Sequence, residues 1–154
     1  MMGIRETRRI LGRYYLTMED YLHRRTFPDE ICRNAYQIDV HSARKDVNRY
    51  AGKKLEEIRK DIDQKACTYS KGESYGIPYR CLVPKGFENL LVAGRCISTD
   101  RQVNGSIRIM TCCMNTGEAA GLAAAMAAGG AANVQNLNTD NLREKLVSYG
   151  AYLP

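Results

Sequence analysis

The sequence lacks features on which several classes of protein depend. It has only two histidines, His23 and His41, and neither is spaced from the other or from a cysteine as metal ligands are. We therefore expect no metal site. The longest apolar run, from Ala119 to Ala132, falls short of the ~20 residues that a membrane-spanning helix needs. We therefore expect a core helix in that run and no membrane segment.

Two sequence motifs are also missing. No Cys-x-x-Cys pair occurs among the six cysteines and no signal peptide precedes them, so reduced thiols in the cytoplasm fit best. No Gly-x-Gly-x-x-Gly turn occurs either. Such a turn joins a strand to a helix and seats the pyrophosphate of a dinucleotide. The sequence therefore does not predict a complete dinucleotide site.

The charge pattern is mixed. The chain carries 23 basic and 17 acidic residues, for a net charge of +6, and the two signs are scattered among each other. No nucleic-acid-reading motif and no aromatic stacking platform accompany the basic residues. We therefore expect a solvated surface and no nucleic-acid partner. With 154 residues, the chain is long enough to bury a core of its own.

The stretch from 89 to 128 organises the rest. Its apolar run Leu90–Ala93, which Gly94 ends, predicts a buried strand. A polar loop, 98–104, leads from there to a predicted helix that is rich in small residues. These recur at helical spacing and would let backbone approach backbone: Gly117, Ala120, Gly121, Ala124, Ala125 and Ala128. The helix could simply pack on a sheet, or its N-terminus could also hold an anion or a polarised carbonyl.

Three ordered motifs carry a resemblance to a known family. They are Asn89–Ser98 with the Gly105–Arg108 and Cys113–Ala125 segments that follow, Gly3–Ile10, and Tyr75–Pro84. Together they resemble the C-terminal flavin-binding segment of FAD-dependent oxidoreductases, which are related to the glutathione-reductase-type fold. The resemblance implies an α+β fold that is the C-terminal fragment of a two-domain FAD-binding fold. The N-terminal region with the Gly-x-Gly-x-x-Gly turn would then be missing.

The resemblance also implies that the chain consists of two regions with different roles. Residues 1–84 would form a substrate-side region with a charged helical insertion at about 43–74, and residues 85–154 the C-terminal return segment of the FAD-binding domain. The family reaction is two-electron (hydride) transfer between a small organic substrate and FAD. We expect the chain alone to lack turnover and to bind FAD weakly or not at all. Its expected partner is the missing N-terminal FAD-binding region.

Candidate site residues follow from the same match. The resemblance places Gly94 and Arg95 beside the flavin's ribityl and phosphate groups, and the helix start at its pyrimidine edge. The candidates for binding the cofactor are Gly94, Arg95, Ser106, Arg108, Met110, Thr111 and Cys112. The substrate-side candidates are Arg5, Arg8, Arg9, Tyr79 and Arg80, because arginine forks suit anionic groups and a tyrosine can line a pocket. The catalytic residues are not identified by the match.

Each candidate also has a purely structural interpretation. Gly94 could be a turn, Ser106 or Thr111 a helix cap, and the arginines members of surface ion pairs. A helix N-terminus lowers thiol pKa values, which would favour a redox role for Cys112 and Cys113, but we expect both to be packing residues. The alternative function is a non-catalytic, stand-alone domain for oligomerisation or partner binding. Its apolar face would be left exposed and would favour a homo-oligomer.

Local patterns predict the remaining elements. They are a bulged strand over 8–17, a helix capped by Thr17, a helix from Pro28 to Ala35, a strand over 36–41, a helix over 53–65, a strand over 77–83, and a last helix over 141–148 capped by Thr139 or Asp140.

Overall fold

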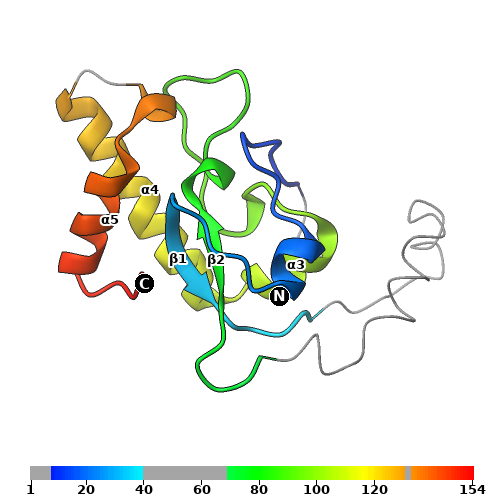
Figure 1. The fold of residues 1–154 in the computed structure, drawn as a ribbon. Helices are drawn as coiled ribbons and strands as arrows, with labels where there is room; N and C mark the ends of the chain where they lie inside the picture. The colour runs from blue at the N-terminus through cyan, green and yellow to red at the C-terminus, as the bar shows by residue number, and fades with distance from the viewer. Residues whose placement is uncertain (1–7, 40–68, 131–132) are drawn as a thin grey trace, which may run out of the picture.

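The computed structural model describes residues 8–39, 69–130 and 133–154. Within these ranges the chain is α+β, as predicted, with four α-helices and a two-stranded antiparallel sheet. The elements are α1 (Met18–Leu22), β1 (Glu30–Asn34), β2 (Tyr75–Pro78), α3 (Arg101–Ile107), α4 (Met110–Gly130) and α5 (Thr139–Ser148), with 3-10 turns η3 (Tyr79–Cys81), η4 (Gly94–Cys96) and η5 (Val134–Asn136). Figure 1 shows α4, α5 and β1 packed together, with β2 beside β1.

The sheet replaces a predicted helix. β1 pairs with β2 so that Cys32 lies opposite Ile77 and Asn34 opposite Tyr75. The expected helix from 28 to 35 is therefore wrong. Ile31 is 1% exposed, and its burial between elements together with pairing to β2 outweighs the local helix-start signal of the proline and acids.

Two predicted strands are also wrong or displaced. Within the described part of 36–41, residues 36–39 form no strand, because the backbone there bonds to side chains: Ser106 Oγ donates to the Tyr36 carbonyl at 2.6 Å. The strand expected over 77–83 instead spans Tyr75–Pro78 and turns into η3, where the Leu82 amide donates to the Tyr79 carbonyl at 2.8 Å.

The first described segment is extended but is not a strand of the sheet. It makes isolated bridges, antiparallel between Gly12 and Pro84 and parallel between Leu16 and Thr99. The predicted Thr17 cap of α1 is confirmed. The Thr17 hydroxyl accepts from the Asp20 amide, and the Asp20 carboxylate accepts from the Thr17 amide, which together form a capping box.

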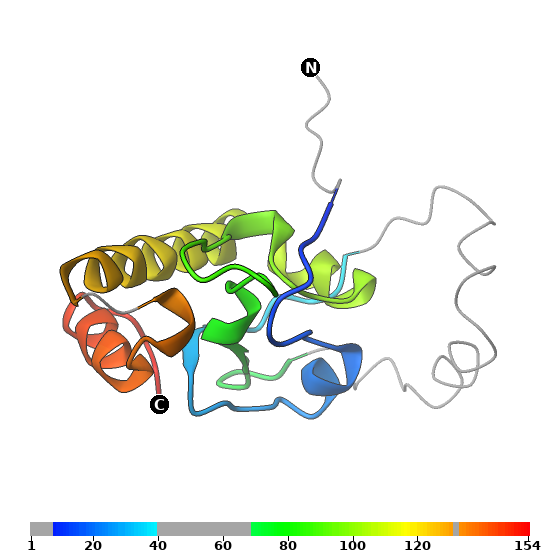
Figure 2. The same cartoon turned by 90° about the horizontal axis from the view of Figure 1, so that it is seen from above.

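The small-residue helix is confirmed as α4, but its orientation differs from the prediction. The stripe that packs inward is Cys112, Thr116, Ala119, Ala123 and Ala127. The predicted packing face points outward instead, and of its members only Ala120 is partly buried. Figure 2 shows α4 along one outer edge of the molecule, with α5 and β1 on its inner side. Small residues cover the helix nearly all round, so spacing alone did not distinguish the two faces.

The predicted buried strand Leu90–Ala93 is wrong for this chain. The segment lies in a loop in which Leu90 is 41% exposed and the next three residues are half-buried. Its one backbone bond to another described segment runs from the Val92 amide to the Leu82 carbonyl at 2.8 Å. A strand requires a neighbouring strand for its hydrogen bonds, and the described residues place none there.

The last predicted helix is confirmed as α5. Asn138 caps it by accepting from the amides of Asp140 and Asn141, instead of the predicted Thr139 or Asp140. Leu142 and Leu146 are buried on its inner face. The helix expected over 53–65, most of the insertion at 43–74, and Arg5 lie outside the described residues.

Candidate functional site

Gly94 brings η4 against the first turns of α4. Its φ of +75° lies in the left-handed region that favours glycine. Its amide donates to the Thr116 hydroxyl at 3.0 Å, and a Cβ at this position would lie 4.0 Å from Cys113 Cβ. Thr116 was missed in the sequence, since a threonine in a run of small helix residues gives no signal of this contact. At the junction of η4 and α4, Gly94 thus brings its backbone close to the helix with no side chain between them.

The start of α4 lies at the surface. Met110 is 74% exposed and Thr111 is also exposed. The first turn carries no acidic residue that would compensate the positive end of the helix dipole. The first amides of any α-helix have no partner within the helix, so this end of α4 can hold an electron-rich group.

Two arginines flank this helix start. Arg95 is exposed and its Nε donates to the Arg108 carbonyl at 3.1 Å. Arg108 is partly buried, and its guanidinium donates to the Asp39 carbonyl. Asn104 holds this corner together, because its side-chain nitrogen donates to the Arg95 carbonyl at 3.0 Å. Its buried side-chain oxygen has no hydrogen-bond partner among the described residues. The structure thus gathers Gly94, Arg95, Arg108, Met110 and Thr111 at one junction.

Ser106 and Cys112 belong to the same segment, but their side chains face the core. Ser106 is fully buried, and its hydroxyl bonds with Asn34 at 3.0 Å and with Tyr75 at 2.8 Å. Asn34, Tyr75 and Ser106 form a buried network of hydrogen bonds. These residues are far apart in the sequence, so the network was not predicted. Cys112 is 4% exposed and faces Cys32.

The cysteine thiols at the helix start are not activated. A hydrogen bond with Cys32 and burial raise the pKa of Cys112 well above its usual value, and burial also raises the pKa of Cys113. Both directions are opposite to the lowering that a helix N-terminus favours. The pKa directions favour packing roles for Cys112 and Cys113 over thiolate chemistry.

The substrate-side candidates divide into two groups. The amide of Ile10 donates to the Cys96 carbonyl at 2.9 Å, so the exposed Arg8 and the partly buried Arg9 lie on a segment that adjoins η4. Tyr79 and Arg80 are instead engaged within the fold. The Tyr79 hydroxyl donates to the Val134 carbonyl at 2.7 Å, and burial raises its pKa to about 12.

Arg80 forms a bidentate ion pair. Its Nε and one terminal nitrogen donate to the Asp29 carboxylate at 2.8 Å and 3.0 Å, and this hydrogen bond raises the pKa of Arg80. Its guanidinium also lies 5.0 Å from the centre of the Tyr14 ring. The guanidinium of Arg80 is therefore paired with Asp29 within this chain. This contact agrees with the interpretation of Arg80 as a member of a structural ion pair.

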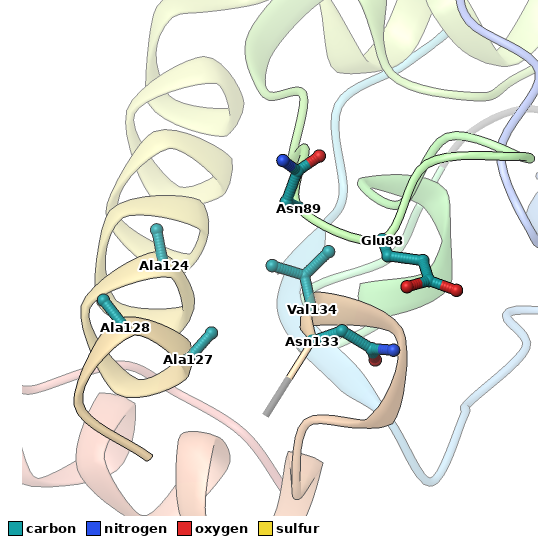
Figure 3. Close-up of a pocket in the computed structure, with 7 residues that line it drawn as sticks. All are labelled: Glu88, Asn89, Ala124, Ala127, Ala128, Asn133 and Val134. Carbon is teal, nitrogen blue, oxygen red and sulfur yellow. The ribbon is translucent and has the colours of Figure 1, made fainter. Parts of the chain in front are cut away.

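A hollow lies at the other end of α4, away from the η4 junction. Figure 3 shows Ala124, Ala127 and Ala128 of the helix on one side of it, facing the segments that carry Asn89 and Val134. Its volume is about 550 Å³, and Glu88 and Asn133 add polar groups at its edge. This hollow adjoins the same helix that begins at the η4 junction.

Two other classes of site can be reported for the described part of the chain. Its residues contain no group of three or more histidine, cysteine, aspartate or glutamate side chains that could hold a metal ion. In the same ranges, no helix combines the length and the apolar character that a membrane span requires.

Comparison with known proteins identifies the family. A search of the curated proteins and a search of the solved structures each found no match to this chain. The family model described as FAD dependent oxidoreductase matches residues 1–146, which is nearly the whole chain. The chain therefore belongs to the FAD-dependent oxidoreductase family.

Proposed function

We propose that this chain is the C-terminal part of an enzyme that transfers two electrons, as a hydride, between a small organic substrate and FAD. The observation that carries the proposal is the junction of η4 and α4. There a left-handed glycine, an exposed helix start and two arginines lie together in a chain of the FAD-dependent oxidoreductase family. FAD, when bound, supplies the hydride chemistry.

The residues at this junction fit one end of the flavin. The start of α4, at Met110 and Thr111, would place helix amides and a positive dipole where negative charge develops on the ring. Gly94 leaves room for close approach, and Arg95 and Arg108 would hold anionic groups. Ser106 and Cys112 would contribute by fixing the backbone of this segment, because their side chains are buried in the core.

The sequence has no Gly-x-Gly-x-x-Gly turn, the motif that binds the pyrophosphate in dinucleotide-binding folds. We therefore propose that a separate FAD-binding region, N-terminal to it in the complete enzyme, covers the outward face of α4. Three features support this. The apolar Leu90–Ala93 segment has no paired strand among the described residues, the hollow in Figure 3 lies beside α4, and an added methyl group at Gly117 or Gly121 would meet no other described element within 4 Å. The chain alone would then be inactive.

For the substrate, the segment beside η4 is the best-placed part of the chain. Arg8 and Arg9 lie there, and Arg5 precedes them in sequence. We propose that the segment that carries Arg8 and Arg9 faces the substrate, whereas Tyr79 and Arg80 contribute to the fold through Val134 and Asp29. The chemistry of the fork favours a carboxylate or another anionic group on the substrate.

The experiment has two parts. The protein encoded by the longest open reading frame that contains this chain is purified and its visible spectrum recorded. We expect absorption bands of oxidised flavin near ~450 nm. FAD is then titrated against the 154-residue chain alone, and no saturable micromolar binding is expected. A longer protein that is colourless and fails to take up FAD would overturn the proposal.

One observation favours a second candidate, a non-catalytic domain used for oligomerisation or partner binding. Met110 and Met114 of α4 are 74% and 72% exposed, and Leu90 is 41% exposed. Such apolar surface favours self-association. Sedimentation of the chain alone tests whether it forms a homo-oligomer. A homo-oligomer whose longer form binds no flavin would establish this function instead.

A further inference from the structure

A small cavity lies where β1, α4 and the end of α5 meet, an arrangement visible in Figure 1 beside the C-terminus. Its volume is about 250 Å³, and it shares no lining residue with the η4 junction. The buried side chains of Ile31 and Leu146 form its floor. Its walls carry polar and aromatic groups: Asn115 and Glu118 from α4, and Tyr149 and Tyr152 from the chain that follows α5.

Hydrogen bonds hold the backbone of the segment that follows α5, which carries both tyrosines. The Ala151 amide donates to the Leu146 carbonyl at 3.0 Å, which turns the chain back on the helix. Farther along, Arg143 donates to the Pro154 carbonyl at 3.1 Å and to the Pro28 carbonyl at 3.0 Å. The Tyr149 amide also donates to the Leu146 carbonyl, at 3.1 Å, and Tyr152 lies between the bonded residues Ala151 and Pro154.

The charge that this cavity presents is negative. Arg33 also lines it, but its guanidinium is committed to the buried Glu30 carboxylate at 3.0 Å and to Ser74 at 2.7 Å. Glu118 differs, because no described residue forms a hydrogen bond or an ion pair with its carboxylate. The hydroxyls of the two wall tyrosines are likewise without a partner in the described ranges. Three exposed residues thus line one small, open hollow: Glu118 with its unpaired carboxylate, Tyr149, which is 66% exposed, and Tyr152, which is 74% exposed.

We propose that this cavity binds a small organic ammonium ion. Glu118 pairs with the cationic charge, and the N-alkyl groups pack against the rings of Tyr149 and Tyr152, whose faces attract cations. The apolar floor accepts the alkyl part of the ligand. The volume limits the ligand to the size of a head group, because sites for larger molecules begin near ~300 Å³. This site is independent of the proposed flavin surface.

Choline and its uncharged isostere 3,3-dimethylbutan-1-ol test the proposal. Each is titrated against the isotope-labelled 154-residue chain, and amide chemical shifts of Glu118 and Gly150 are followed. We expect saturable shifts with choline, with a Kd on the order of 1 mM, and much weaker shifts with the alcohol. Glu118→Gln is expected to weaken choline binding about threefold or more, and Tyr149→Leu about threefold.

Glu144→Gln is the matched control, because Glu144 is an exposed α5 glutamate that does not line the cavity. It should bind choline like the unmodified chain, and the amide spectra of all variants show whether they are folded. Equal binding of choline and its isostere would overturn the proposal. So would equal choline affinity in folded Glu118→Gln and Glu144→Gln, or the absence of shifts at these amides.

Discussion

The two long faces of α4 are built from similar small residues but have different surroundings. The inward stripe is buried against β1, η4, η5 and α5: Cys112, Thr116, Ala119, Ala123 and Ala127. The outward face, with Gly117, Gly121, Ala124 and Ala128, is exposed. Small side chains are explained on the inward face by close packing within this chain. At Gly117 and Gly121 an added methyl group would meet no described residue of another segment within 4 Å, which fits a surface that a further region covers.

The core on the inward side depends on paired charges as well as on packing. Glu30 is 1% exposed, and Arg33 is its cationic partner. Arg33→Met should lower the free energy of unfolding by about 3–5 kcal/mol, because it leaves a buried carboxylate without its partner. Urea denaturation measures the change. Arg101→Met, at an exposed arginine, is the control and should shift stability by no more than about 0.5 kcal/mol. Equal effects of the two changes would show that the Glu30 pair is not structurally important.

Adjacent alanines separate the two faces directly. Ala123 is fully buried, whereas Ala124 is exposed on the outward face. Ala123→Leu should destabilise the chain by about 1–3 kcal/mol through overpacking, and Ala124→Leu should change its stability by less than about 0.5 kcal/mol. Thermal unfolding of both variants checks the difference. A large loss in Ala124→Leu would mean that the chain itself covers this face, for instance in a homo-oligomer.

The pH dependence of stability sharpens the description of the inward side. Burial raises the pKa of Tyr79 from 10.0 to about 12. Between these pH values the unfolded chain loses the phenolic proton before the folded chain does. The stabilising contribution is therefore complete below pH 10 and is lost as the pH rises through about 12.

Tyr79→Phe should flatten this decline, which unfolding curves between pH 9 and 12 can measure. It should not abolish the decline, because burial and Asp20 also raise the pKa of Tyr14 to about 12. At neutral pH the variant should lose about 1 kcal/mol with the hydrogen bond to Val134. An unchanged slope at high pH would show that the Tyr79 hydroxyl is already ionised or solvated in the folded chain.

The sequence predicted what local signals determine. The Thr17 cap, the helix now seen as α4 and the amphipathic α5 each follow from spacing and capping residues within a few positions. The strand β1 was missed, because pairing with β2 depends on residues more than forty positions away and overrides a local helix signal. The orientation of α4 was missed because alanine and glycine surround the helix nearly evenly.

The sequence predicted which segment carries the candidate residues but not which of their side chains face the core. The family motif located the junction of η4 and α4, and Gly94, Arg95 and Arg108 meet there. The motif could not tell that Ser106 and Cys112 face inward, since this depends on Asn34, Tyr75 and Cys32 from distant parts of the chain. Whether a side chain points toward the core depends on the tertiary packing, and the sequence of one segment does not determine it.

The most direct test of the central claim compares two glycines in the longest open reading frame that contains the chain. Gly94 and Gly86 have φ values of +75° and +84°, so valine strains the backbone similarly at both. Only Gly94 lies at the junction that we propose faces the flavin. The account predicts that Gly94→Val loses bound flavin, measured as absorbance near ~450 nm per protein, while Gly86→Val retains it. Equal flavin content in the two folded variants would contradict it.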